Sequence, residues 1–117
     1  MKSYENLIVW QKSMTLVVLI YKLTEKFPKE EIYRLTSQMR RAAVSIPSNI
    51  AEGSRRSSKK DFRNFLVNAY GSGAELETQI KITKLLQFSK TEDYVKTEQT
   101  LQEVMRMLNK LTETLKS

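Results

Sequence analysis

The side chains with the clearest chemical potential in this sequence are basic, and they are concentrated in its middle part. Residues 34–63 hold eight basic and two acidic side chains, whereas residues 1–33 hold five and four, and residues 64–117 hold seven and seven. The net charge of +7 therefore lies almost entirely in one segment. A local positive patch of this kind is typical of proteins that meet phosphate groups. The candidate nucleic-acid-binding residues are Arg40, Arg41, Arg55, Arg56, Lys59, Lys60 and Arg63.

Two interpretations of this basic segment stay open at the level of sequence. Arg55 and Arg56 precede an expected helix start, where unpaired backbone N–H groups and the helix dipole also favour anions, so this corner is suited to phosphate. Without exposed aromatic residues among them, the basic side chains would hold a sugar-phosphate backbone rather than read bases. The alternative is a solvated surface with no ligand.

Arg40 and Arg41 have a separate structural interpretation. They flank apolar positions of the same expected helix, so at least one of them should reach inward or into an interface. Glu75 and Glu77 are the candidate partners, and an ion pair is expected rather than catalysis. Two carboxylates at positions i and i+2 of a helix point away from one another, so these two are unsuited to acid-base chemistry.

Two residue types on which most familiar catalytic constellations depend are absent. The chain contains no cysteine and no histidine, which removes disulfides, thiolate nucleophiles and imidazole acid-base catalysis together. We therefore expect a non-enzymatic protein with no catalytic residue, no metal site and no cofactor. The longest apolar run, residues 16–21, is too short to span a membrane, and we recognise no export signal. A cytoplasmic location is expected, which the lack of cysteine also fits.

The elements that must position the basic residues are predicted to be helices. Three glycines and two prolines are few for a chain of this length and argue against a turn-rich β fold. Apolar residues recur at three- and four-residue steps, as on one face of an α-helix. Such segments with short connections predict one all-α domain over residues 1–117, an antiparallel up-down-up-down four-helix bundle. The expected helices cover about 4–26, 30–52, 59–88 and 92 to the C-terminal end.

Each expected helix has an apolar face that should form the core. In the first helix this face is Leu7, Trp10, Met14, Val17, Val18 and Tyr21, and in the second it is Ile32, Leu35, Met39, Ala42, Ala43, Ile46 and Ile50. In the fourth helix it is Leu101, Val104, Leu108, Leu111 and Leu115. The small residues Ala69, Gly71, Gly73 and Ala74 in the third helix suggest close approach to a neighbouring helix, with Ala42 and Ala43 as the candidates. Ser58 and Thr91 are the expected N-caps of the third and fourth helices.

The segment SIPSNIAEGS, residues 45–54, interrupts the second helix with a proline. Pro47 removes one backbone donor, which kinks a helix at a cost of about 3 kcal/mol unless neighbouring side chains compensate. Gly53 is expected to end the helix as its C-terminal cap. The bend either wraps the helix round its neighbours or also aims the basic loop at a ligand or another subunit. The residues of this kink motif are Ser45, Pro47, Asn49, Glu52 and Gly53.

These segments resemble a bacterial family of four-helix-bundle proteins encoded by intervening sequences of 23S ribosomal RNA genes. The matching stretches are YENLIVWQKS, LTSQMRRAAVSIPSNIAEGSRRS, FRNFLVNAYGSGAELETQI and the leucine-rich C-terminal helix. The resemblance covers essentially the whole chain, and SIPSNIAEGS is its most specific part. The family is also similar to the accessory variability protein of diversity-generating retroelements.

The resemblance implies a bundle that assembles into a homopentameric ring with a basic surface for nucleic acid, RNA or DNA. In the retroelement relatives such a ring also partners a reverse transcriptase. The family has no established catalytic residue to carry over. Two functions are therefore expected to compete: a nucleic-acid-binding homo-oligomer, with RNA favoured, and a protein-interaction scaffold in which the basic excess is incidental.

Overall fold

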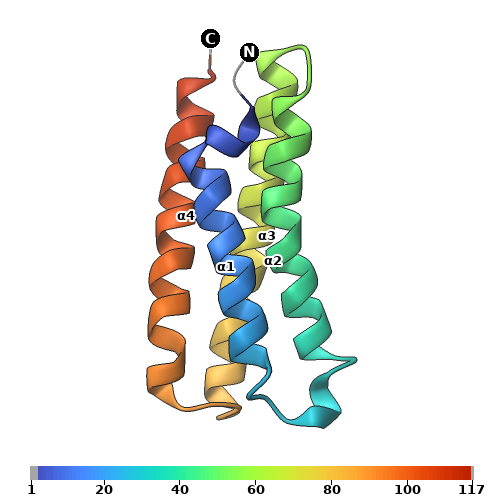
Figure 1. Cartoon of the computed structure of the whole chain (residues 1–117), viewed down its shortest axis with the longest axis vertical. Helices are drawn as coiled ribbons and strands as arrows, with labels where there is room; N and C mark the ends of the chain where they lie inside the picture. Colours follow the sequence, from blue (N-terminus) through green and yellow to red (C-terminus); the bar gives the residue numbers. More distant parts are fainter. Residues whose placement is uncertain (1–2, 117) are drawn as a thin grey trace.

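Four α-helices form an antiparallel bundle in the computed structural model, which describes residues 3–116 of the chain. Each helix runs opposite to the one before it, so α1 begins and α4 ends at the same end of the bundle (Figure 1). Sequential helices pack side by side, and α1 also packs against α4. This confirms the predicted all-α up-down-up-down bundle. The elements are η1 (Tyr4–Asn6), α1 (Ile8–Thr24), η2 (Lys29–Glu31), α2 (Leu35–Ser54), α3 (Lys59–Leu85), η3 (Thr91–Tyr94) and α4 (Val95–Thr114).

The core lies along the bundle axis and receives aliphatic side chains from every helix. Each is removed from water, which is the main favourable term in folding. The fully buried aliphatic and methionine side chains are Leu16, Ile20, Met39, Ile46, Ile50, Leu66, Leu76, Ile80, Leu101, Val104 and Leu108. The apolar faces predicted for the second and fourth helices are thus largely confirmed. Among α1 to α4, no helix is long and apolar enough to cross a membrane.

The predicted core face of the first helix is wrong at three of its six residues, whereas Leu7, Trp10 and Val17 pack against the core. Met14, Val18 and Tyr21 are 42%, 51% and 42% exposed, and the buried face of α1 is instead Val9, Ser13, Leu16, Ile20, Leu23 and Thr24. Because α1 is apolar round most of its circumference, the three-four spacing fits two faces equally well. Ser13 belongs to the true face because its hydroxyl donates to the Trp10 carbonyl at 2.7 Å, which satisfies a buried polar group.

The first two helices also begin later than predicted. Leu7 has extended backbone angles and separates η1 from α1. The second helix begins at Leu35 instead of residue 30, and Ile32, a predicted core residue, is 49% exposed in the turn before it. A spacing of three residues also fits the 3-10 turn η2, so Ile32 and Leu35 did not distinguish a short turn from a continuous helix.

Gly53 does not cap the second helix, contrary to prediction. It lies inside α2, is buried and has no positive φ. A Cβ at this position would lie 2.5 Å from the Cβ of Phe65 on α3. The glycine therefore permits close contact between the end of α2 and the start of α3, which presents the loop at residues 55–58.

The third helix begins as predicted, but its close approach is to a different helix. The Asp61 backbone N–H donates to the Ser58 side chain at 3.1 Å, which confirms the predicted N-cap. A Cβ at Gly73 would collide with Met105 of α4, so the close approach is to α4 rather than to Ala42 and Ala43 of α2. The predicted N-cap at Thr91 is wrong, because Thr91 begins η3 and α4 starts at Val95.

Candidate nucleic-acid interface

The seven predicted nucleic-acid-binding residues do not form one surface. Arg40 and Arg41 lie in the first half of α2, whereas the others lie where α2 ends and α3 begins. Arg41 and Arg55 are 14 positions apart, and a helix of that length spans about 21 Å. We call the group at the α2–α3 junction the basic end, and it consists of Arg55, Arg56, Lys59, Lys60 and Arg63.

Arg40 serves the contact between α1 and α2. Its Nε donates to the Thr24 hydroxyl at 2.9 Å, and a terminal nitrogen donates to the Tyr21 carbonyl at 3.4 Å. The guanidinium carbon also lies 4.4 Å from the centroid of the Tyr21 ring. Basic side chains stabilise helix C-termini, where carbonyls lack intrahelical partners. Arg40 thus holds the end of α1, and its predicted pairing with Glu75 or Glu77 is wrong.

Arg41 is exposed and lines a shallow polar groove between α2 and α3. The groove has a volume of about 230 Å³, and its lining residues are Gln38, Arg41, Ala42, Ser45, Ser72 and Glu75. No ion pair within 4.0 Å joins Arg41 to Glu75 among residues 3–116. Glu75 instead accepts a hydrogen bond from the Gln79 side chain at 3.1 Å. Arg41 therefore keeps its donors open, but it stands apart from the basic end.

The kink motif joins α2 to α3 at this groove. The Ser45 and Ser72 hydroxyls are hydrogen-bonded at 2.8 Å, and the Asn49 amide donates to the Ser45 carbonyl at 2.8 Å and to its hydroxyl at 3.0 Å. Pro47 is buried within α2, which continues through it to Ser54. Glu52 faces the loop and pairs with Arg56 at 2.8 Å. The polar residues of the motif thus make contacts within the chain.

Within the basic end, two of the five side chains are already engaged. Arg56 pairs with Glu52, and its guanidinium carbon lies 4.8 Å from the centroid of the Phe65 ring. Arg63 is partly buried and donates to the Leu115 carbonyl at 3.3 Å, at the C-terminus of α4. Lys59 and Lys60 are exposed at the first turn of α3 and form no ion pair within residues 3–116.

Arg55 lies over an aromatic ring that sequence reasoning did not connect with the basic segment. Its guanidinium carbon is 5.3 Å from the centroid of the Tyr4 ring, within the range of a cation–π contact. Tyr4 is held in turn by Trp10, with the ring centroids 5.2 Å apart and the planes at 70°. Tyr4 and Arg55 are 51 positions apart, so no local spacing could have predicted the contact.

The sequence matches a protein-family model over residues 5–110, nearly the full chain. The model describes the 23S rRNA-intervening sequence proteins. The chain belongs to this family. A search of curated proteins found no match.

A solved structure supports the fold. The chain is similar to a protein of unknown function from the S23 ribosomal protein family of Bacteroides thetaiotaomicron, with a TM-score of 0.83 and 24% sequence identity. The match covers 91% of this chain and 96% of the other. At this identity the similarity shows a shared fold.

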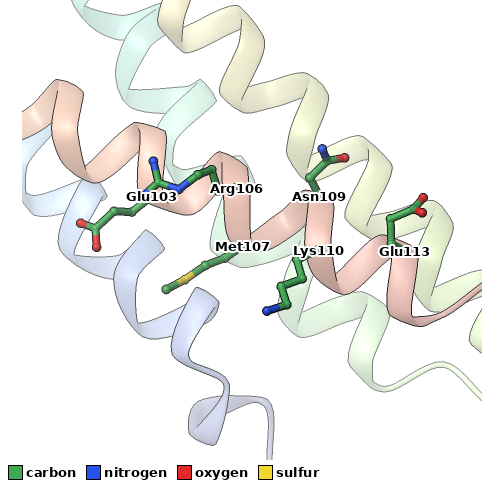
Figure 2. Close-up of a pocket in the computed structure, with 6 residues that line it drawn as sticks. All are labelled: Glu103, Arg106, Met107, Asn109, Lys110 and Glu113. Carbon is green, nitrogen blue, oxygen red and sulfur yellow. The ribbon is translucent and has the colours of Figure 1, made fainter.

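A surface groove along α4 does not form a candidate site. It has a volume of about 520 Å³, and its lining residues all come from α4: Glu103, Arg106, Met107, Asn109, Lys110 and Glu113. Figure 2 shows Met107 directed toward α1, whereas Asn109 and Glu113 leave the other side of the helix. Side chains that diverge in this way cannot converge on one ligand. No group of three or more acidic side chains among residues 3–116 is placed to hold a metal ion.

Among residues 3–116, two side chains have pKa values shifted from their ordinary values, and both lie at the opposite end of the bundle. A hydrogen bond from Ser89, followed by the contact with Lys26, holds the pKa of Asp93 below its ordinary value. Burial raises the pKa of the Tyr94 hydroxyl, which is hydrogen-bonded to Thr83 at 2.9 Å. Both residues stand beside structural partners, and neither lies near the basic end.

Proposed function

We propose that this chain is a non-enzymatic nucleic-acid-binding protein that works as a homo-oligomer, with RNA as the favoured ligand. The observation that carries the proposal is the basic end, where Arg55, Lys59 and Lys60 are exposed and have no carboxylate partner among residues 3–116. Side chains of this kind bind phosphates and release counterions. Membership of a family named for an intervening sequence in 23S rRNA supports RNA over DNA.

The exposed apolar face of α1 supports self-association. Met14, Val18 and Tyr21 follow one another at helical spacing and are each more than 40% exposed, and Val44 on α2 is 40% exposed. Apolar side chains exposed on one face of a helix can form interaction sites when they are contiguous. A ring of five copies is the assembly that the family resemblance implies. Several copies of the basic end would then raise avidity for one nucleic acid.

The first test is the salt dependence of RNA binding. Affinity for a structured RNA is measured by fluorescence anisotropy between about 50 and 200 mM salt. If each subunit neutralises about four phosphates, the affinity should fall roughly 50- to 150-fold over this range. Absence of binding at the low-salt end would overturn the proposal.

The second test removes the charges of the basic end. One variant replaces Arg55, Arg56, Lys59 and Lys60 by serine. A control of equal charge change replaces four exposed lysines elsewhere, Lys22, Lys81, Lys90 and Lys96. We expect the first variant to lose RNA binding while its oligomeric state stays that of the original chain. The control should retain most of its affinity for RNA. Equal losses in both variants would mean that net charge alone attracts RNA.

A second candidate function is a protein-interaction module without a nucleic-acid role, for example an accessory protein of a reverse transcriptase. The exposed face of α1 favours it, because apolar side chains suit a protein partner and do not bind phosphate. This candidate predicts that the serine variant of the basic end collapses to a monomer, and that nucleic acid never changes the mass of the assembly.

Self-association is tested separately through Val18→Glu. Val18 is 51% exposed, so a charge there is compatible with a folded single chain but not with a buried apolar interface. Sedimentation should show a homo-oligomer for the original chain and a smaller species for the variant. The control is Thr15→Glu, at an exposed polar position one turn away. An unchanged mass in the Val18 variant would exclude this face from the interface.

A further inference from the structure

Arg55 differs from the other arginines of the basic end in having a held position and open donors. It is exposed, it lies over the Tyr4 ring at 5.3 Å, and its side chain forms no hydrogen bond or ion pair within residues 3–116. Arg56 donates a hydrogen bond to the Glu52 carboxylate, and Arg63 donates one to the Leu115 carbonyl. Among these three, the Arg55 guanidinium is the one that lies over an aromatic ring with all of its N–H donors open, since Arg56 lies over Phe65 but also donates to Glu52.

The support beneath Arg55 is a short element with several specific contacts. Tyr4 belongs to η1, which Ser3 caps by accepting from the Glu5 backbone N–H at 3.2 Å. The Tyr4 ring meets Trp10 edge-on, and η1 also contacts α2. Because a cation–π contact restrains the guanidinium, less side-chain freedom is lost when a ligand binds it.

We infer that Tyr4 and Arg55 form a stacking platform for an unpaired base, so that the basic end binds single-stranded nucleic acid in preference to duplex. The inference rests on the proposed nucleic-acid function and names the class of ligand. A planar guanidinium stacks on a base while its N–H groups reach the base edge or a phosphate. In a duplex the faces of each base are covered by its neighbours, so this contact is available only to an unstacked base.

The neighbouring lysines suit the same strand. Lys59 is four positions after Arg55, so the two backbones are at most about 14 Å apart. The ammonium groups of Lys59 and Lys60 would then meet phosphates of the same strand while one of its bases occupies the platform. The basic end would then combine base stacking with backbone contact, as non-specific single-strand binders do. This inference differs from the expectation from sequence, in which the basic side chains hold the sugar-phosphate backbone rather than read bases.

The experiment compares binding of a single-stranded RNA of about 12 nucleotides with binding of the same sequence as a duplex. Anisotropy gives both dissociation constants for the original chain and for Tyr4→Leu and Arg55→Lys. The lysine variant keeps the charge but loses the guanidinium plane. Each variant should weaken single-strand binding at least about fivefold, the lower bound for loss of one base stack, and leave duplex binding within about twofold.

Two matched controls separate the platform from charge and from packing. Arg106→Lys makes the same chemical change at an exposed arginine of α4, outside the basic end, and should leave the single-strand preference unchanged. Tyr4→Phe keeps the ring and should retain the affinity that Tyr4→Leu loses. Thermal unfolding checks that each variant is folded. If Tyr4→Leu is not folded, the result for Arg55→Lys alone decides whether the stacking platform exists.

The outcomes distinguish this inference from the proposed function. Binding of single strands and duplex with equal affinity, or full single-strand affinity in Arg55→Lys, would overturn the platform and leave nucleic-acid binding intact. Absence of binding to either RNA at about 50 mM salt would overturn both. Single-stranded DNA of the same sequence serves as a further probe, because a stacking platform should accept it within a small factor of the RNA.

Discussion

The two ends of the bundle use charged side chains in different ways. At the end where α1 finishes and α4 begins, Lys26 pairs with Asp93 at 3.0 Å, Lys84 with Glu98 at 3.1 Å, and Arg40 binds the last turn of α1. At the basic end Arg56 pairs with Glu52, and Lys116 pairs with Glu113 at the end of α4. The ion pairs of the first end join different elements of the fold, whereas Arg55, Lys59 and Lys60 at the basic end have no carboxylate partner among residues 3–116.

The backbone of the basic end is nevertheless held firmly. Gly53 brings α2 against Phe65, and Arg63 ties the start of α3 to the end of α4. A rigid support that presents unpaired cations costs less conformational entropy on binding than a mobile loop does. The comparison therefore teaches that the basic end leaves cations without carboxylate partners although its helices are joined by specific contacts.

The first prediction tests the rigidity of the basic end through its glycine. Gly53→Ala should lower the free energy of unfolding by about 1–3 kcal/mol, because the new Cβ would lie 2.5 Å from the Phe65 Cβ, which cannot move without its backbone. Gly71→Ala is the matched control. No atom lies within 4 Å of a Cβ at Gly71, so alanine should stabilise α3 by about 0.5–1 kcal/mol.

Urea unfolding of the two glycine variants provides the measurement. A Gly53 variant as stable as the original chain would mean that α2 and α3 separate at little cost, and the basic end would then resemble a mobile loop. The sign of the difference between the two variants matters more than its size, because both substitutions add the same methyl group to a helix.

The second prediction compares the effects of replacing two arginines, Arg40 and Arg55, by alanine. Arg40→Ala should lower the free energy of unfolding by about 1–2 kcal/mol, since it removes charged hydrogen bonds and a cation–π contact. It should leave RNA affinity nearly unchanged. Arg55→Ala should do the reverse, with a stability change within about 0.5 kcal/mol and a clear loss of RNA affinity. Loss of RNA binding in Arg40→Ala without loss of stability would contradict the division between the ends.

The fold could be predicted from the sequence because apolar periodicity reports helices directly. The stripe of α4 was found at Leu101, Val104 and Leu108, all of which are buried. The stripe of α1 was misplaced because its apolar residues surround the helix, and spacing alone cannot choose between Leu16 and Val18. Burial of one face and exposure of the other depends on where the neighbouring helices lie.

The candidate site was predictable only as a segment of charge. A run of basic residues along the chain becomes a surface only if the fold brings the residues together, and α2 separates Arg41 from Arg55 by most of its length. The carbonyl that engages Arg63 and the ring beneath Arg55 come from the two ends of the sequence. Such contacts arise from the antiparallel topology, which places η1, the α2–α3 loop and the end of α4 together (Figure 1).

The smallest expected effect lies at the opposite end and depends on pH. The pKa of Asp93 is lowered in the folded chain, first by the Ser89 hydroxyl at 2.6 Å and then by Lys26. A lowered folded pKa contributes stability above the unfolded value, and this contribution is lost as the pH falls through the folded value. Asp93→Asn should therefore be slightly less stable than the original chain at neutral pH, and the difference should shrink below about pH 4. Urea midpoints measured from neutral to acidic pH provide the check, with Glu92→Gln as the exposed neighbouring control. A difference that is constant with pH would show that the Asp93 charge does not help to close this end, so its contrast with the basic end would then rest on Arg40 and Lys84.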